Sequence, residues 1–89
     1  MSDASLTQND KRNIQALLEH LLTRQSREAM ERCLRDLFTP AELLEISHRL
    51  QIFRMLDAGM PQRKIAEELG VAIATVTRGS KAYKKSKQI

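Results

Sequence analysis

Apolar residues recur at the spacing of one helical face in the first half of the chain. The first stripe comprises Ile14, Leu17, Leu18, Leu21 and Leu22, and the second comprises Met30, Cys33, Leu34, Leu37 and Phe38. Thr7, Asn9 or Asp10 is placed to cap the first helix, and Ser26 to cap the second. Because Cys33 lies inside the second stripe, we expect it to be a small buried hydrophobe rather than a nucleophile.

The segment "TPAE" (residues 39–42) marks the start of a third helix. Thr39 can accept from first-turn amides, Pro40 suits the first helical position, and Glu42 would complete a capping box. Apolar residues follow at Leu43, Ile46, Leu50, Phe53 and Leu56, and Gly59 would stop the helix. Additional apolar residues at Leu44, Ile52 and Met55 widen this surface, as is typical of a helix at the centre of a bundle or between two chains.

The next segment predicts a helix-turn-helix over about residues 61–84. Pro61 can open its first helix, in which Ile65, Ala66 and Leu69 form a narrow apolar stripe. Gly70 would supply the positive φ of the turn. Six residues later, Val76 would return to the core beside Ile65 and Leu69.

The segment "VAIATVT" (residues 71–77) also fits a strand, because it alternates and is rich in β-branched residues. The sequence offers no second strand for it to pair with, and a lone strand is not stable. We therefore expect residues 72–84 to be helical, and the fold to be an all-α helical bundle with a C-terminal helix-turn-helix.

The chain length of 89 residues suits one small domain. We expect residues 1–6 to be a disordered lead-in and residues 7–89 to form a single domain. The one cysteine excludes an internal disulfide, and with His20 and His48 it gives no metal-ligand spacing. Self-association is then the expected source of extra stability. With neither a membrane span nor a signal peptide in the sequence, a cytoplasmic location is expected.

Basic residues are concentrated at the C-terminal end. Residues 1–68 contain ten Lys and Arg and eleven Asp and Glu, whereas residues 69–89 contain five basic residues and no acid. Such a distribution indicates a polyanionic partner or, alternatively, a solubilising tail. Placed within a helix-turn-helix, it favours double-stranded DNA.

Short side chains at the start of the last helix would let it enter a major groove closely. We expect Ala72, Ile73, Ala74, Thr75 and Thr77 to face base edges, with plain helix surface as the alternative for the two threonines. Gln62 and Arg63 are placed to meet phosphates, and Lys81 and Lys84, with Lys85 and Lys87, would extend the basic surface. No catalytic constellation is found, so we expect no enzyme activity.

Three segments of the chain resemble the tryptophan repressor family. "IATVTRGS" within residues 73–80 is similar to the core of the family's recognition helix, "LFTPAE" to the segment before its central helix, and "HRLQIFRML" to that helix itself. This resemblance implies an intertwined homodimer that binds a palindromic operator. It also implies a corepressor, L-tryptophan or a related indole, although the residues by themselves require no cofactor.

The resemblance assigns the ligand to four residues. Arg49 and Arg78 match the two arginines that sandwich the indole, Thr39 would meet the ligand carboxylate, and Gly79 would leave room for the ring. Guanidinium planes stack on aromatic faces, which makes this chemistry sound. Other roles stay open: Thr39 as a helix cap, Arg49 as a partner of Glu45, and Arg78 as a phosphate contact.

Some positions depart from the tryptophan-binding pattern. Ala82 stands where those members carry a serine, Asp36 stands where they carry a leucine, and "AGMPQ" is one residue shorter. The resemblance ends before the family's last helix, and we expect residues 7–38 to close the dimer by interlocking. A ligand-independent DNA-binding regulator and a helical protein-interaction module are the alternative functions.

Overall fold

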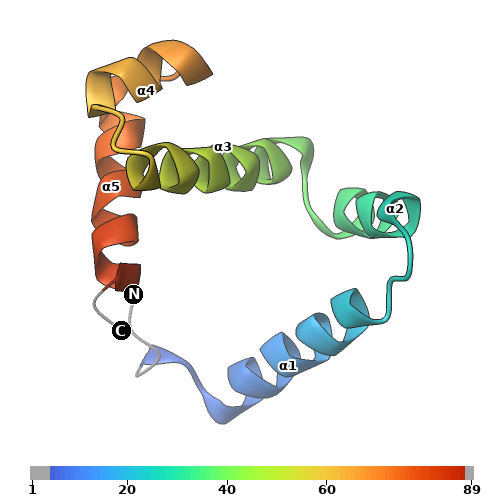
Figure 1. Cartoon of the computed structure of the whole chain (residues 1–89). Helices are drawn as coiled ribbons and strands as arrows, with labels where there is room; N and C mark the ends of the chain where they lie inside the picture. Colours follow the sequence, from blue (N-terminus) through green and yellow to red (C-terminus); the bar gives the residue numbers. More distant parts are fainter. Residues whose placement is uncertain (1–4, 88–89) are drawn as a thin grey trace. The chain divides into compact units, whose positions relative to one another are not determined.

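Five α-helices account for most of the described residues (Figure 1). The computed structural model describes residues 5–87, and these contain no strand. The helices are α1 (Gln8–Leu22), α2 (Arg27–Leu37), α3 (Pro40–Asp57), α4 (Gln62–Leu69) and α5 (Ile73–Lys87). The all-α prediction is confirmed. Of the predicted lead-in, residues 1–4 lie outside the described residues.

Local side-chain caps begin the first two helices where the sequence predicts them. Thr7 Oγ1 accepts from the Asp10 amide, and the Asp10 carboxylate accepts from the Thr7 amide, both at 3.0 Å. This reciprocal pair is a capping box. At α2, Ser26 Oγ accepts from the Ala29 amide at 3.0 Å. Thr7 is therefore the cap among the three candidates for α1.

The last two helices differ from their predicted bounds by a few residues. Pro61 is the N-cap of α4, which begins at Gln62. The predicted helix over residues 72–84 is confirmed as α5, which begins at Ile73 and continues to Lys87. Ala72 precedes it and accepts from the Thr75 amide at 3.0 Å. The extra turn at the end carries Lys87, which is held by a carboxylate on α3.

The described chain divides into two compact units, Met1–Thr39 and Pro40–Ile89. In the first unit, α1 has no buried residue, and Cys33 is the buried residue of α2. Cys33 is thus a small buried hydrophobe, as predicted. Leu22 of α1 is 83% exposed. Because so little apolar surface is covered, this unit lacks a core of its own among residues 5–39.

The second unit has a core to which α3, α4 and α5 each contribute one fully buried side chain. Ile52, Ile65 and Val76 are at most 1% exposed. Partly buried residues surround them: Met55, Leu56, Met60, Ala66, Leu69 and Val71. Each fully buried aliphatic side chain of this kind contributes about 1.5–3 kcal/mol to folding. The predicted meeting of Val76 with Ile65 and Leu69 is confirmed.

Two glycines end the helices of this unit with positive φ. Gly59 (φ 83°) follows α3, and Gly70 (φ 66°) follows α4. Beyond Gly70, the Val71 amide donates to the Ala66 carbonyl at 3.1 Å. This turn redirects the chain so that α5 can pack across both α3 and α4.

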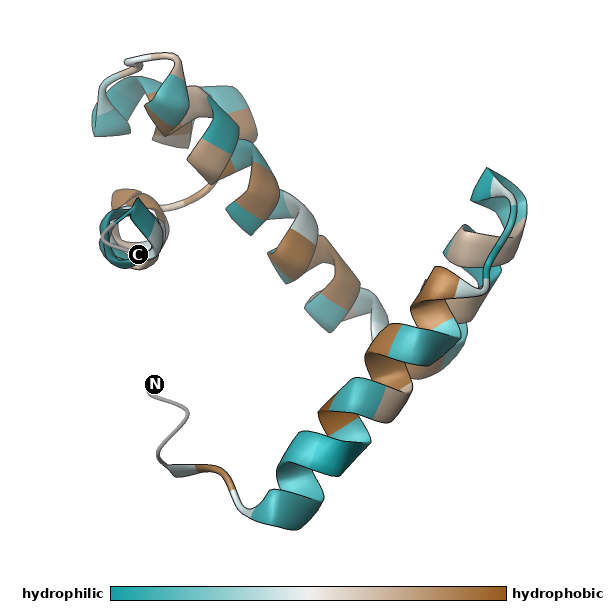
Figure 2. Ribbon diagram, turned by 60° about the horizontal axis from the view of Figure 1, so that its bottom comes forward, coloured by the Kyte–Doolittle hydropathy of each residue, from teal (hydrophilic) through white to brown (hydrophobic). Residues whose placement is uncertain are grey.

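Large apolar residues remain exposed on α1 and α3. Figure 2 colours the ribbon brown at hydrophobic residues, and both helices carry several such segments. On α3 the predicted stripe is not the most buried face: Ile46 and Leu50 are each about half exposed, whereas Ile52 is buried. The prediction that α3 is apolar on more than one side agrees with this finding. In residues 5–87, the helices are all too short or too polar to cross a membrane.

Candidate nucleic-acid interface and ligand pocket

The N-terminal half of α5 presents short side chains to solvent. Ala72, Ile73, Ala74 and Thr77 are exposed, and Thr75 is half-buried. Val76 lies between them and is fully buried in the core. One side of this half-helix is therefore held by packing while the other side remains accessible, which is the arrangement that insertion into a groove requires.

Thr77 and Gln62 contact each other across the two helices. Thr77 Oγ1 lies 3.1 Å from Gln62 Oε1 and 3.0 Å from the Ile73 carbonyl oxygen. A hydroxyl has one hydrogen, so it donates to only one of these acceptors at a time, while its lone pairs remain available. Sequence reasoning placed the two residues on different parts of a DNA partner and missed that they join α4 to α5.

Several basic side chains of α4 and of the C-terminal half of α5 have no ionic partner among the described residues. Arg63, Lys81, Lys84 and Lys85 are exposed, and within residues 5–87 none of them forms an ion pair. Lys64 pairs with Glu68 at 3.7 Å, and Lys87 pairs with Asp57 at 3.4 Å. Lys87 therefore has a carboxylate partner inside the protein, which the sequence did not reveal.

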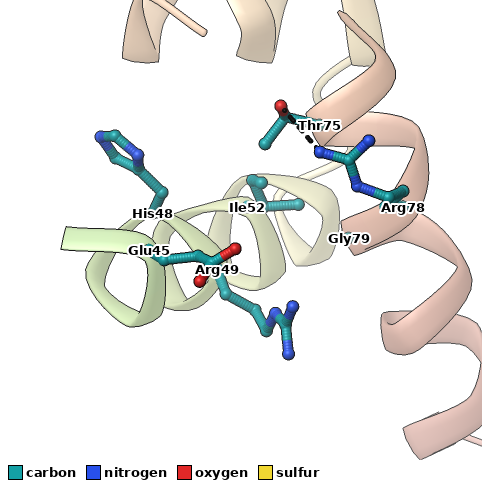
Figure 3. A pocket seen from close by; sticks show the side chains of 7 residues that line it. All are labelled: Glu45, His48, Arg49, Ile52, Thr75, Arg78 and Gly79. Atoms are coloured by element: carbon teal, nitrogen blue, oxygen red, sulfur yellow. Dashed lines mark hydrogen bonds between the residues drawn. The ribbon is translucent and has the colours of Figure 1, made fainter. Parts of the chain in front are cut away.

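Three of the four predicted ligand residues line one small pocket between α3 and α5 (Figure 3). Its walls are Glu45, His48, Arg49 and Ile52 from α3, and Thr75, Arg78 and Gly79 from α5. Thr39 is the last residue of the other unit, so its assignment to the ligand stays a prediction. The structure thus brings Arg49, Arg78 and Gly79 together from segments far apart in the sequence.

The charged groups of this pocket have no ionic partners in the described part of the chain. Arg78 Nη2 donates to Thr75 Oγ1 at 3.4 Å, whereas Arg49 and Glu45 form no ion pair. Figure 3 shows the Arg49 side chain extending away from Thr75 and Arg78. The pocket measures about 50 Å³. Since ligand sites usually need roughly 300 Å³ or more, the pocket in this conformation admits only a few water molecules.

Gly79 has a packing reason to be glycine. A Cβ atom built on Gly79 would lie 2.9 Å from Ile52 Cγ2 and 3.1 Å from Ile52 Cδ1. Ile52 is 1% exposed and belongs to the core, so it has little freedom to move away. The absent side chain therefore lets α5 approach α3 closely, while the predicted role of Gly79 toward an indole remains a prediction.

A second contact between α3 and α5 involves Tyr83, and the sequence analysis missed it. The Tyr83 hydroxyl donates to the Asp57 carboxylate. The Tyr83 ring meets Phe53 edge-on, with centroids 5.7 Å apart, and Lys87 Nζ lies 5.6 Å from the centroid of the Tyr83 ring. The pairs Phe53–Asp57 and Tyr83–Lys87 are each four residues apart, which is the only signal the sequence carries.

This contact shifts the titration of both partners. The hydrogen bond from Tyr83 lowers the pKa of Asp57, because it stabilises the carboxylate, and the nearby Lys87 acts in the same direction. The same hydrogen bond raises the pKa of Tyr83, because losing the proton would break the bond and place two negative charges together.

Within residues 5–87, no group of His, Cys, Asp and Glu is arranged to hold a metal ion.

Comparison with known proteins agrees with the resemblance noted in the sequence. Residues 12–88 match the family described as Trp repressor protein. The "Trp operon repressor homolog" of Chlamydia trachomatis serovar L2 is 41% identical over 70 residues, which are 73% of this chain and 74% of the relative. The protein of the same name from Vibrio atlanticus is 37% identical over 84 residues, 92% of this chain and 86% of the relative.

A third protein with that name, from Pasteurella multocida, is 39% identical over 70 residues, 78% of this chain and 69% of the relative. No solved structure matches the chain significantly. Because the family match spans nearly all of the chain, including every helix from Arg12 onward, the chain belongs to the Trp repressor family.

Proposed function

We propose that this protein is a homodimeric transcriptional repressor that binds a palindromic DNA operator in a sequence-specific manner. The observation that carries the proposal is the exposed face of α5, which combines short side chains with unpaired basic residues and contains no acid. The family membership and the relatives named as Trp operon repressor homologs support the same function.

The proposed contacts divide into base readers and phosphate binders. The residues that meet base edges lie at the start of α5 and just before it: Ala72, Ile73, Ala74, Thr75 and Thr77. Because the Thr77 proton is shared with Gln62 and Ile73, Thr77 acts mainly as an acceptor, which suits the exocyclic amino groups of adenine or cytosine. Gln62, Arg63, Lys81 and Lys84 meet phosphates and set the position of α5 on the duplex.

Dimer formation is supported by apolar surface that the chain leaves uncovered. Leu17, Leu18 and Leu22 of α1 are between 37% and 83% exposed, and Leu44 and Leu50 of α3 are about half exposed. Monomeric proteins seldom leave so many large apolar side chains open at helical spacing. A second copy of the chain that interlocks with residues 7–38 would bury them.

The Arg49–Arg78 pocket is the proposed site for L-tryptophan or a related indole. Two guanidinium groups can stack on an aromatic ring or bind a carboxylate, and Glu45 can bind an ammonium group. The pocket volume of about 50 Å³ means that α5 or its side chains must move to admit the ring. Ala82 and Asp36, which depart from the tryptophan-binding pattern, favour the second candidate, a repressor that binds DNA without a small ligand.

The test of DNA binding is selection of bound sequences from a random duplex pool, followed by two variants. Thr77→Ala is expected to change the preferred base at one position, by about 1 kcal/mol, because it removes a base-reading hydroxyl. Lys84→Ala is expected to weaken binding to all duplexes equally. It should also lower the slope of log affinity against log salt concentration by about 1. Equal loss for every sequence in both variants contradicts base reading by α5, and no binding even at low salt favours a protein-interaction module.

The test of the ligand is thermal melting with and without L-tryptophan. A ligand that binds only the folded protein at 100 times its Kd stabilises it by about 2.7 kcal/mol, which raises the midpoint. The Arg78→Ala variant is expected to lose this rise. An unchanged midpoint at millimolar L-tryptophan, with duplex binding intact, would support the ligand-independent repressor.

A further inference from the structure

Besides the core that Val76 shares with Ile52, α5 meets α3 at two points that lie one turn apart on the helix. The first is Gly79 against Ile52, where the α5 backbone lies so close to the Ile52 side chain that a Cβ would collide. The second is Tyr83 against Asp57 and Phe53. Val76 and Gly79 hold the middle of α5, and the contact at Tyr83 adds a point farther along the helix, so that together they determine the crossing angle.

The crossing angle between α3 and α5 matters because α5 moves as a rigid helix, so a change in its tilt displaces its N-terminal residues. Ile73 lies six residues before Gly79, which is about 9 Å along a helix. A tilt of about 10° around Gly79 therefore displaces Ile73 by about 1.5 Å. Hydrogen bonds to base edges tolerate only a few tenths of an ångström in distance. The contact at Tyr83 thus contributes, together with the packing of Val76, to whether the first turns of α5 fit a groove.

Asp57 is otherwise poorly placed in its own helix. It is the last residue of α3, where the helix dipole presents partial negative charge and disfavours an acid. The local structure gives no reason for a carboxylate at this position. The Tyr83 hydroxyl and the Lys87 ammonium, both from the last turns of α5, supply the compensating donors.

We infer that Tyr83 and Asp57 are positioning residues that hold the DNA-reading end of α5 at its working angle against α3. Phe53 supports the Tyr83 ring, and Lys87 belongs to this cluster rather than to the phosphate-binding residues. The inference rests on the proposed DNA-binding function. It assigns the orientation of α5 to contacts within the chain, so that part of the operator affinity requires no ligand.

The first experiment compares Tyr83→Phe and Asp57→Ala with the wild-type protein on a selected duplex and on a scrambled one. Each variant is expected to bind the selected duplex about two- to tenfold more weakly, the range expected from loss of one hydrogen bond. Binding of the scrambled duplex, which depends on charge, is expected to change less. The ratio of the two affinities therefore falls.

Glu68→Ala is the matched control for Asp57→Ala. Both substitutions remove one exposed acid, but the partner of Glu68 is Lys64 on the same helix. Removing an acid makes the protein more positive, so electrostatics alone predicts tighter DNA binding for both variants. Weaker binding of the selected duplex in Asp57→Ala but not in Glu68→Ala supports a positioning role. Equal behaviour of the two variants overturns it.

The second experiment observes the contact without DNA. Tyr83 is the single tyrosine and the chain has no tryptophan, so ultraviolet titration of the phenol reports on this residue alone. The pKa of Tyr83 is expected to lie above its ordinary value in the wild-type protein and to fall toward that value in Asp57→Ala. Identical titrations show that the contact is not formed in solution and overturn the inference, whatever the DNA results.

The two experiments separate the two proposals. If the wild-type protein binds no duplex, the proposed function fails, and the positioning role fails with it even though the phenol titration still detects the contact. If the wild-type protein selects a sequence and Tyr83→Phe binds it equally well, the function stands and the inference is wrong. A Tyr83→Phe protein that merely melts earlier, with an unchanged affinity ratio, also contradicts positioning.

Discussion

Gly79 illustrates how one missing side chain organises the α3–α5 contact. Its position against Ile52 leaves no room for a methyl group, and Ile52 cannot retreat because it is enclosed by the core of the second unit. In an open helix, replacing glycine by alanine is stabilising by about 0.5–1 kcal/mol. Here the collision opposes that gain.

We therefore predict that Gly79→Ala destabilises the protein by about 1–3 kcal/mol, the usual range for overpacking. Chemical denaturation measures the loss. The control is the same substitution in an Ile52→Ala background, where the colliding Cγ2 and Cδ1 atoms are gone and the cost of Gly79→Ala should shrink. Additive effects of the two substitutions would show that the two residues are not in contact.

The Asp57–Tyr83 pair predicts a pH window for stability. The Tyr83 hydrogen bond lowers the pKa of Asp57. The contribution of ionised Asp57 to folding stability is therefore fully present above the ordinary pKa of 3.8 and is lost as pH falls through the lowered value. The pKa of Tyr83 is raised by the same bond, so its contribution is fully present below 10.0 and is lost as pH rises through the raised value.

The difference in melting midpoint between the wild-type protein and Tyr83→Phe should accordingly be constant across this window and shrink at both ends. Midpoints measured over a series of pH values check this prediction. A difference that does not depend on pH would attribute the effect to ring packing alone.

At the scale of elements, the turn between α4 and α5 depends on Gly70. Residues with a Cβ rarely adopt the φ of 66° found at Gly70, although no neighbouring atom lies within 4 Å of the position that a Cβ would take. Strain in the backbone, rather than collision, is therefore the cost of a substitution. The side-chain link between Thr77 and Gln62 then holds the two helices that the turn has brought together.

Gly70→Ala is predicted to destabilise the protein by about 1 kcal/mol or more, because alanine tolerates the left-handed conformation poorly. Gly70→Asn is the comparison, since asparagine adopts this conformation more readily and should lose less. Denaturation curves of the two variants provide the measurement. An equal or greater loss for Gly70→Asn would contradict backbone strain as the cause.

At the scale of the whole molecule, apolar burial is uneven. Residues 40–87 contain the shared core of Ile52, Ile65 and Val76, whereas α1 has no buried residue. A helix of 15 residues is marginal in water without packing, so α1 needs a partner surface. The proposed homodimer supplies one.

For such a dimer the melting midpoint rises with protein concentration. Leu18→Gln should lower the midpoint and steepen this dependence, because it places an amide in the proposed interface. Glu19→Gln introduces the same residue at the adjacent exposed position and should change little. A midpoint that is independent of concentration, with both variants alike, would argue for a monomer.

Much of the fold follows from local sequence. The five helices could be predicted because their signals act over only a few residues. These signals are the periodic apolar positions, the caps Thr7 and Ser26, and the glycines Gly59 and Gly70. The meeting of Ile65 with Val76 could also be predicted, since a tight turn leaves two short helices few ways to pack. The helical state of residues 73–77 required one global argument, the lack of a partner strand.

Relationships between α3 and α5 could not be read from the sequence. Periodicity placed Ile46 and Leu50 in the main apolar stripe and Ile52 only among the residues that widen it, and only the packing shows that Ile52 is the buried one. The contacts of Gly79, Tyr83 and Thr77 likewise depend on where the helices cross. Sequence alone determined which segments are basic and, apart from residues 73–77, which are helical, because those properties are local. Tertiary structure decided which side chains meet, because a small change in a crossing angle exchanges one set of neighbours for another.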